Sequence, residues 1–473
     1  MTVAIYIVIR DMFITHDALQ QTCMRLRAVI AFFILMLCTT TVMAETKTLE
    51  KKNPIIFIPG IMGSRLYDPE GNLVWIEYSL KLTKLGEGMR MQNALIVKNN
   101  EIDQVTVPVN EREYGAMGPI GYPYKKIIDL LCNEFPDRGM YFFSYDFRQS
   151  KSNSSDLLHQ QIQNILQKTG GSKVDIIAHS LGGLVLATYL ETYGREHIRK
   201  IITAATPYEG TPDTINTALT GELTYVPAGW LEAVTKLTRE VRTSFPSSTE
   251  LIPTNAYDDL HPAYLYTGNV PANDEIHETE ITFLEGDPYY TPAGLTKDAG
   301  LNVYKPLTGS QYELILRKIF GDEHPLRLEN DSRIITTIDN SYFAVGINHQ
   351  TIRSLIFSDD LSDPRVTHVI YDHEGDGCVP KGSATMHGYL ETLGKDAQGN
   401  ERLLKVEAEH GGITSHNKAL DWIVAVLSDK STESILSDPA ITDKSIIVKT
   451  AGHHEIVSKL HNLVTSIKNQ KNT

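Results

Sequence analysis

Apolar runs alternate with amphipathic segments through the first half of the chain. The run Ile55–Ile58 is bounded by proline and glycine, which predicts a strand buried on both faces. Met140–Tyr145 and Ile198–Ala205 are also strand-like. Between them, Tyr124–Cys132 and Leu157–Leu166 carry apolar residues at helical spacing. Strands that alternate with helices in this way predict an α/β fold with a mostly parallel central sheet and helices on both faces.

The most informative stretch covers residues 173–190. It reads as an apolar strand, a sharp turn at Ser180 and an apolar-faced helix, which is the context of a nucleophile elbow. The usual pattern is Gly-x-Ser-x-Gly. Here Ala178 stands at the first small position, and Gly182 with Gly183 supplies the second. The pattern favours Ser180 as a nucleophile over the alternative of an ordinary tight turn.

The strand–helix rhythm is interrupted twice. Periodicity is poor over residues 65–115, which include Trp75, and this indicates a lid above the sheet. From about residue 216 to 332 aromatic and proline residues are scattered, which predicts a cap over the active site, with a separate small domain as the alternative. Strands resume at 341–346 and 365–371, so residues 45–427 form one domain with two insertions.

The two ends of the chain lie outside this domain. Residues 1–44 combine a basic pair, the apolar run 28–37 and a small-residue cleavage site ending at Ala44, which predicts a secretory signal peptide. Met24 directly precedes the basic pair and is the expected translation start. The protein is therefore expected to be exported, to a periplasm or to the extracellular space. Residues 428–473 form a C-terminal extension whose last part predicts an amphipathic helix.

Composition narrows the class of partner. The 473 residues contain 44 Lys and Arg against 58 Asp and Glu, for a formal charge of −14, which argues against binding to nucleic acid. No zincin, Walker, paired CxxC or dinucleotide motif occurs, so neither a metal nor another cofactor is expected. The oligomeric state cannot be inferred from the sequence.

The cysteines leave two alternatives open. After the leader only Cys132 and Cys378 remain, which allows one disulfide or two free thiols.

A serine nucleophile needs an imidazole to take its proton and a carboxylate to orient that imidazole. Asp376 lies on a glycine-flanked loop after a predicted strand, with Asp372 as its nearest rival. His410 follows a strand-like stretch and precedes a helix, and its rival His416 is expected at or within that helix. The order serine, acid, histidine is that of the α/β-hydrolase arrangement. We therefore predict a triad of Ser180, Asp376 and His410.

An oxyanion needs two preorganised N–H donors. The N–H of Leu181, directly after the nucleophile, is one candidate. The other is the N–H of Ile61, in the loop after the first strand. His179 points away from the serine side chain in an extended segment and is interpreted as a structural residue.

Several segments together resemble the lecithin:cholesterol acyltransferase family. They are Pro54–Leu66, which is similar to its opening strand and oxyanion loop, Ser144–Arg148, and Arg239–Ser247 followed by Leu251–Pro253, which resembles a cap segment of this family. The resemblance spans about residues 54–427. It implies an α/β-hydrolase with Ser180, Asp376 and His410 as the triad and with Ile61 and Leu181 as oxyanion donors.

Two departures from the family stand out. Ala178 replaces a glycine, and no cysteine flanks Trp75, although animal members bridge their lid at that point with a disulfide. The resulting hypothesis is an exported serine esterase that cleaves or transfers the acyl groups of lipid esters. Trp75 is the candidate for contact with lipid or a membrane surface. The alternatives are a secreted esterase acting on non-lipid esters and a non-catalytic hydrolase fold that serves as a binding protein.

Overall fold

The computed structural model describes residues 52–67, 73–75, 110–111, 121–220, 243–253, 265–267, 278–281, 305–321, 332–435 and 446–450. All of them except Lys52 belong to the compact unit that begins at Asn53. The predicted signal peptide, the C-terminal amphipathic helix and most of the predicted lid and cap lie outside the described residues.

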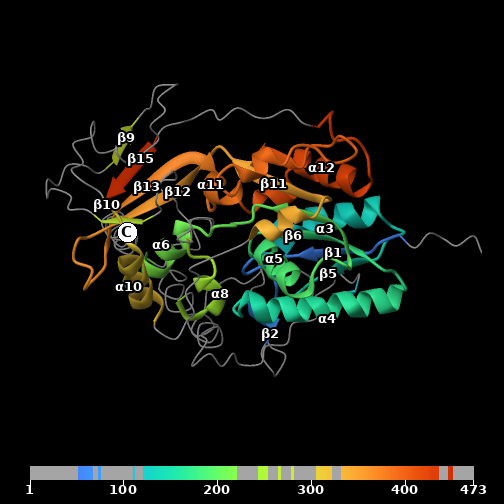
Figure 1. The fold of residues 1–473 in the computed structure, drawn as a ribbon, viewed down its shortest axis with the longest axis horizontal. Helices are drawn as coiled ribbons and strands as arrows, with labels where there is room; N and C mark the ends of the chain where they lie inside the picture. The colour runs from blue at the N-terminus through green and yellow to red at the C-terminus, as the bar shows by residue number, and fades with distance from the viewer. Residues whose placement is uncertain are drawn as a thin grey trace, which may run out of the picture. The chain divides into compact units, whose positions relative to one another are not determined.

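The central sheet has seven strands in the order β14-β11-β7-β6-β1-β5-β4 (Figure 1). The first six of these pair in parallel, and β4 (Asn110–Glu111) adds to β5 in antiparallel orientation. The parallel strands are β1 (Ile55–Ile58), β5 (Met140–Phe142), β6 (Val174–His179), β7 (Ile198–Ala204), β11 (Ser341–Ile347) and β14 (Leu403–Glu407).

Helices cover both faces of this sheet. In β1 the side chains of Ile56 and Ile58 enter one core, whereas those of Ile55 and Phe57 enter the other, as expected for a strand buried on both sides. The first core is closed by α4 (Lys151–Thr169) and α5 (Leu181–Tyr193), and the second by α3 (Gly121–Glu134) and α12 (Asn417–Leu427). The predicted fold class, a mostly parallel sheet with helices on both faces, is confirmed.

Local sequence accounts for the limits of α4. The Ser150 side chain accepts a hydrogen bond from the N–H of Asn153, which caps the first turn, and Gly170 ends the helix with φ 62°. In contrast, α5 has buried residues on every side because it lies at the centre of the fold. This places the start of α5, directly after Ser180, inside the protein.

A second, six-stranded sheet has the order β10-β8-β12-β13-β15-β9. Only β8 and β12 pair in parallel. Helices α6 (Pro212–Thr220) and α10 (Gly309–Phe320) pack their apolar residues against it. Its strands are β8 (Leu265–Thr267), β9 (Glu278–Ile281), β10 (Lys305–Pro306), β12 (His349–Phe357), β13 (Val366–Gly375) and β15 (Ile446–Thr450).

This second sheet differs from the simple cap expected from the sequence. It joins strands from the predicted cap with β12 and β13, which follow the cap, and with β15 of the C-terminal extension. The strand expected at 365–371 is present as β13, but it belongs to this sheet rather than to the central one. Part of the predicted lid also differs, because β4 pairs with the central sheet.

Short elements complete the described chain. The two strands β2 and β3 form a hairpin that carries Trp75. These elements are β2 (Leu66–Tyr67), β3 (Leu73–Trp75), α8 (Pro246–Thr249), η2 (Ser332–Thr337), α11 (Lys381–Ala384), η3 (Tyr389–Thr392) and η4 (Gly412–Ser415). In the part of the chain that the structure describes, no helix has the length and apolar character required to cross a membrane.

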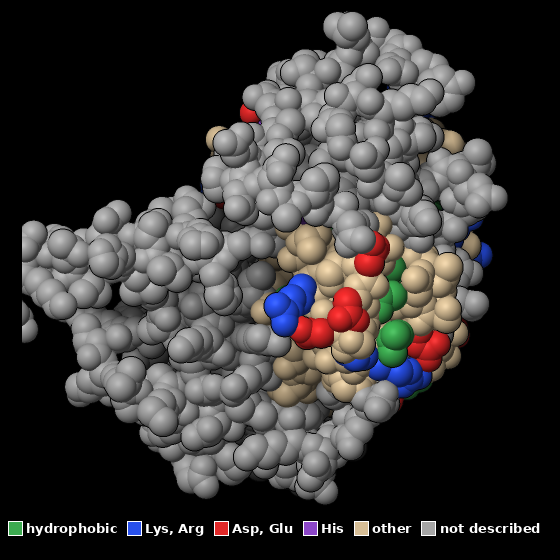
Figure 2. Space-filling model, turned by 90° about the vertical axis from the view of Figure 1, so that its left-hand side faces the viewer, with side chains coloured by type: hydrophobic (Ala, Val, Ile, Leu, Met, Phe, Trp, Pro, Cys, Tyr) green, Lys and Arg blue, Asp and Glu red, His purple; other side chains and the backbone are tan. Residues whose placement is uncertain are grey.

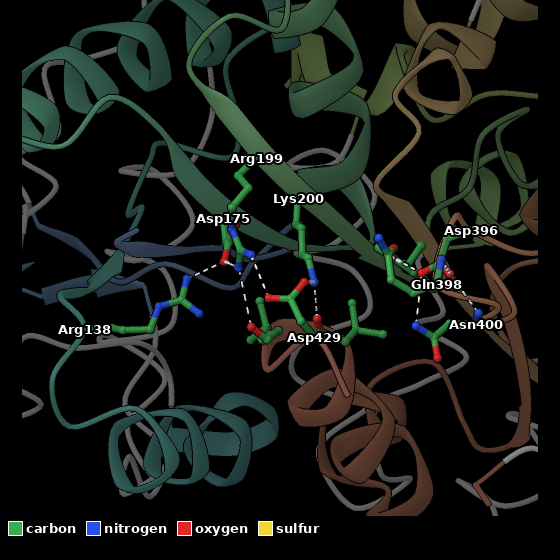
Figure 3. A network of polar contacts seen from close by, with 11 residues as sticks. Arg138, Asp175, Arg199, Lys200, Asp396, Gln398, Asn400 and Asp429 are labelled. Carbon is green, nitrogen blue, oxygen red and sulfur yellow. Dashed lines mark hydrogen bonds and ion pairs between the residues drawn. The ribbon is translucent and has the colours of Figure 1, made fainter. Parts of the chain in front are cut away.

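Charged side chains occur both on the surface and in a buried cluster at one end of the central sheet strands β6 and β7. On the described part of one face, acidic and basic side chains lie next to one another (Figure 2). At the amino-terminal ends of β6 and β7, by contrast, Asp175 is fully buried between Arg138 and Arg199 (Figure 3). Arg199 and Lys200 also bind Asp429, at 3.0 and 2.7 Å, and so attach the segment after α12 to the sheet.

Candidate active site

Ser180 lies at a strained turn between β6 and α5. Its φ of 53° and ψ of −127° are unusual for a residue with a side chain, and such strain persists only where the surrounding structure holds it. The carbonyl of Ala204 in β7 accepts a hydrogen bond from the Ser180 N–H at 2.9 Å, and the Ser180 carbonyl accepts one from Gly183. The turn therefore presents the hydroxyl at the carboxyl end of the sheet.

Glycines allow the close packing around this turn. A Cβ at Gly182 would lie 2.6 Å from the carbonyl oxygen of Pro59, and one at Gly183 would lie 2.1 Å from the Thr206 hydroxyl. Ala178, which stands where glycine is usual, is fully buried, and its methyl group belongs to the core between the sheet and α4 and α5. The first small position therefore accommodates a methyl group, whereas the second, at Gly182 and Gly183, does not.

The structure brings Ser180, His410 and Asp376 together. His410 Nε2 lies 2.9 Å from Ser180 Oγ, and His410 Nδ1 lies 2.8 Å from Asp376 Oδ2. The three side chains come from the end of β6, the loop after β13 and the loop after β14. All three residues are buried among the described elements. A neutral imidazole in this position donates from Nδ1 to the carboxylate and accepts the serine proton at Nε2.

The loop of Asp376 is shaped around its carboxylate. Oδ1 accepts hydrogen bonds from the N–H groups of Cys378 and Val379, at 2.9 and 2.7 Å, which leaves Oδ2 for His410. Gly346, at the carboxyl end of β11, permits the approach, because a Cβ there would lie 2.7 Å from the Cβ of Asp376. The carboxylate is thus fixed by two backbone donors before it orients the imidazole.

The two rival residues lie elsewhere. Asp372 belongs to β13, where it pairs with Thr351 and accepts from the N–H of Glu374 at 3.0 Å. Burial raises the pKa of its carboxyl group above the ordinary value. His416 is the residue that precedes α12, as expected, and burial lowers the pKa of its imidazole. Among the described residues, the side chain hydrogen-bonded to Ser180 Oγ is that of His410, not that of Asp372 or His416.

The loop after β1 covers Ser180 with a tight turn. The N–H of Gly63 donates to the carbonyl of Gly60 at 3.1 Å, and Met62 has φ 64° between them. A Cβ on Gly60 would lie 2.7 Å from the Ser180 Cβ, so only glycine allows this approach. Among the described residues no hydrogen-bond partner is found for the N–H groups of Ile61 and Leu181. The assignment of these two N–H groups as oxyanion donors stays a prediction.

Trp75 contacts this same turn. Its indole N–H donates to the carbonyl of Met62 at 2.8 Å, and its ring meets Phe147 edge to face, with centroids 5.8 Å apart. The side chain is partly exposed and packs against the core. Contact of Trp75 with lipid stays a prediction, and its attachment to the oxyanion loop was not expected from the sequence.

Sequence reasoning also missed Tyr124, on α3. Its hydroxyl accepts from the N–H of Gly60 at 2.9 Å and lies 2.8 Å from His179 Nδ1. His179 Nε2 lies 2.9 Å from the carbonyl oxygen of His410. Burial, and then the neighbouring His410, lowers the pKa of His179 to about 3, so His179 is neutral at physiological pH. The helical spacing around Tyr124 predicted only that its side chain faces the core.

Neither cysteine forms a disulfide. Cys132 and Cys378 are not joined to one another, so the disulfide that the sequence allowed is absent. Cys378 contributes its backbone N–H to the Asp376 carboxylate. Among the described residues no group of His, Cys, Asp and Glu side chains is arranged to hold a metal ion.

The central sheet and the strand–turn–helix at Ser180 define the fold of an α/β-hydrolase. Residues 121–290 match the family model of lecithin:cholesterol acyltransferase. The resemblance to this family is therefore confirmed over a segment that contains the Ser180 elbow and the start of the predicted cap. The chain is similar to the lecithin:cholesterol acyltransferase family in this segment.

Two relatives come from Arabidopsis thaliana. Phospholipase A(1) LCAT3 is 26% identical over 199 residues, which cover 36% of this chain and 44% of that protein. Lecithin-cholesterol acyltransferase-like 4 is 23% identical over 407 residues, which cover 77% of this chain and 74% of that protein. The alignment with the first relative thus spans less than half of its length.

Two solved structures are also similar. The Tle4–Tli4 complex gives a TM-score of 0.43 at 16% identity, over 80% of this chain and 99% of that chain. The mature form of Bacillus licheniformis lipase BlEst2 gives a TM-score of 0.30 at 12% identity, over 80% and 92% of the respective chains.

Proposed function

We propose that this protein is a serine esterase that cleaves or transfers the acyl group of a lipid ester through an acyl-enzyme on Ser180. The observation that carries the proposal is the continuous hydrogen-bonded chain from Ser180 Oγ to His410 and on to Asp376, with distances of 2.9 and 2.8 Å. These three groups stand in the roles that nucleophilic acyl transfer needs.

In the first half-reaction Ser180 Oγ attacks the ester carbonyl while its proton passes to His410 Nε2. Asp376 stabilises the imidazolium that forms, because Oδ2 accepts from Nδ1. The N–H groups of Ile61 and Leu181 donate to the oxyanion of the tetrahedral intermediate. His410 then returns the proton to the leaving alcohol as the carbon–oxygen bond breaks, and the acyl group stays on Ser180.

In the second half-reaction an acceptor attacks the acyl carbonyl and gives its proton to His410. The bond between the acyl carbon and Ser180 Oγ then breaks, and His410 returns the proton to Oγ. Water as acceptor gives hydrolysis, and a lipid alcohol gives acyl transfer. The same residues serve both outcomes, so the acceptor that enters the site decides between them. Product analysis in the presence of a long-chain alcohol separates the two, because only transfer yields a new ester.

A lipid ester is the substrate class that the comparisons favour. Two relatives are named as a phospholipase A(1) and as an acyltransferase-like protein, and both names concern lipid acyl esters. The partly buried apolar side chains of Ile61, Met62 and Trp75 pack against the core beside the serine and are suited to contact an acyl chain. Partly exposed Trp75 is also the candidate for contact with a lipid surface.

The test has two stages. Labelling with a fluorophosphonate reports an activated serine whatever the substrate, and Ser180→Ala should abolish it. Incubation with phosphatidylcholine liposomes should then release fatty acid in a Ser180-dependent manner. A folded protein that does not label would contradict the enzyme proposal. Labelling with turnover only on short, monomeric esters would instead favour an esterase of non-lipid substrates.

We further propose that the enzyme is exported, with residues 1–44 as a cleaved leader. The basic pair, the apolar run 28–37 and the cleavage site at Ala44 support this. Amino-terminal sequencing of the protein recovered outside the cytoplasm should begin at Glu45. Retention of the leader on cytoplasmic protein would contradict the proposal.

A further inference from the structure

Beneath Ser180 a buried hydrogen-bonded chain joins the oxyanion loop to the loop of the general base. It runs from the N–H of Gly60 to the Tyr124 hydroxyl, on to His179 Nδ1, and from His179 Nε2 to the carbonyl of His410. The three distances are 2.9, 2.8 and 2.9 Å. Both side chains in the chain, Tyr124 and His179, are at most 3% exposed. Neither Tyr124 nor His179 takes part in the proton transfers proposed above.

Chemistry fixes the direction of every bond in this chain. The His410 carbonyl can only accept, so His179 Nε2 must carry a hydrogen and donate it. A neutral imidazole has one donor and one acceptor, so Nδ1 accepts from the Tyr124 hydroxyl. The Tyr124 oxygen in turn accepts from the N–H of Gly60. No other arrangement satisfies all four groups, and a buried polar group left without a partner is costly.

We propose that Tyr124 and His179 are positioning residues that hold the oxyanion loop and the general base at a fixed separation around Ser180. This inference rests on the proposed acyl-transfer function. His179 directly precedes the nucleophile, so the chain ties three parts of the site to one another: the turn that contains Ile61, the elbow and the His410 loop. Because Tyr124 occupies the N–H of Gly60, the next amide, that of Ile61, is the one left to donate to the oxyanion.

The close contact between the oxyanion loop and the elbow shows why a fixed position of this loop matters for the reaction rate. Gly60 packs so closely that a Cβ would lie 3.1 Å from His179 Nδ1 and 3.2 Å from Ser180 Oγ. A shift of about 1 Å in a reacting group costs roughly a hundredfold in rate. The hydrogen bond from Gly60 to Tyr124 opposes such a shift without touching the substrate.

Tyr124→Phe tests the proposal, because it keeps the ring and removes the hydroxyl. We expect the rate of fluorophosphonate labelling of Ser180 to fall at least about tenfold, since the phosphonyl oxygen uses the oxyanion donors. With an ester substrate kcat should fall while KM changes little. Tyr342→Phe is the matched control: it removes a buried hydroxyl that donates to Asp396 at 2.6 Å from the amino-terminal end of β11. It should label at the rate of the wild type.

A pair of variants at His179 separates positioning from packing. In His179→Gln the amide can donate to the His410 carbonyl and accept from Tyr124, whereas His179→Leu fills space only. We expect Gln to recover most of the labelling rate and Leu to lose at least about tenfold. This pair also decides the question if Tyr124→Phe does not fold.

Three outcomes would overturn the inference, and they differ in what else they overturn. Wild-type rates in a folded Tyr124→Phe protein would contradict it while leaving the enzyme proposal intact. Equal rates for His179→Gln and His179→Leu would reduce His179 to a packing residue. A folded wild-type protein that does not label would remove the proposed function and this inference together.

Discussion

The carbonyl oxygen of Asp376 accepts a hydrogen bond from the backbone N–H of His410 at 2.8 Å. Their side chains are also hydrogen-bonded at the same distance, 2.8 Å. The two residues are therefore joined twice, although they are 34 positions apart in the chain and lie on different loops. This double contact fixes both the position of the His410 backbone and the orientation of its imidazole.

The first prediction concerns the carboxylate. Asp376→Asn keeps an oxygen for the N–H groups of Cys378 and Val379, so the loop should fold normally. The amide cannot hold the imidazole in the tautomer that accepts the Ser180 proton, and kcat should fall by about 10⁴-fold. Fatty-acid release measured on folded protein checks this.

Asp372→Asn is the matched control for that experiment, because Asp372 is the rival carboxylate and is also buried. Its Asn oxygen can still accept from the N–H of Glu374, so activity should stay near that of the wild type. A large loss at Asp372 with little loss at Asp376 would show that the acid has been assigned to the wrong residue.

The second prediction concerns the glycine above the nucleophile. Gly60→Ala would place a Cβ 2.7 Å from the Ser180 Cβ, so the loop must move away from the serine. We expect labelling of Ser180 to slow by about tenfold to a hundredfold, with little change in secondary structure. Gly412→Ala lies near His410 but meets its nearest neighbour at 3.7 Å and should label normally. Equal rates for the two variants would contradict this account.

Sequence patterns were sufficient for the inner strands of the central sheet because these strands are buried on both faces and consist largely of apolar residues. Ile55–Ile58 is apolar throughout, Ile176–Ala178 is the apolar part of β6, and each strand is followed by a turn with glycine. The order of Ser180, Asp376 and His410 along the chain could likewise be read directly. The structure then places these three residues within hydrogen-bonding distance.

The second sheet could not be predicted in the same way. β8, β9 and β10 have two to four residues each, which is too short for a period to show. β12 mixes polar and apolar residues, and β15 pairs with β13 across more than 70 positions. Pairing between such distant segments depends on tertiary packing and leaves no local signature.

The contacts of Tyr124 and His179 were hidden for a related reason. Periodicity indicates that Tyr124 faces the core. Its hydrogen-bond partner His179 lies 55 positions further along the chain, and the His410 carbonyl that His179 contacts lies another 231 positions beyond. Every residue has a backbone carbonyl, so the sequence does not mark which carbonyl accepts a given hydrogen bond. No motif could therefore reveal that His179 donates to the carbonyl of His410. Only the packing of α3 against the sheet brings the three together.

The third prediction is the pH dependence of stability. The pKa of His179 is lowered from 6.5 to about 3 in the folded state, so its contribution is fully present above pH 6.5 and is lost as the pH falls toward 3. The full difference corresponds to roughly 5 kcal/mol, of which about 3 kcal/mol is lost by about pH 4.5.

Gln at position 179 cannot titrate, so His179→Gln should lose less free energy of unfolding than the wild type between about pH 7 and pH 4.5. Chemical denaturation at the two pH values measures the difference. His197→Gln, at a partly exposed histidine, is the control and should follow the wild-type profile. An unchanged pH dependence in His179→Gln would mean that His179 is not held neutral by burial.

The fourth prediction concerns Asp175, which is fully buried between Arg138 and Arg199 at the end of the sheet opposite to Ser180. Asp175→Asn removes the carboxylate that the Arg138 guanidinium, itself 4% exposed, binds, and breaking a buried ion pair costs about 3–5 kcal/mol. Labelling of Ser180 in the protein that remains folded should be unchanged, because no contact of Asp175 reaches the site among the described residues. Asp363→Asn, which breaks the exposed pair with Arg365, should change stability little. Equal effects of the two substitutions would show that burial does not set the contribution of Asp175.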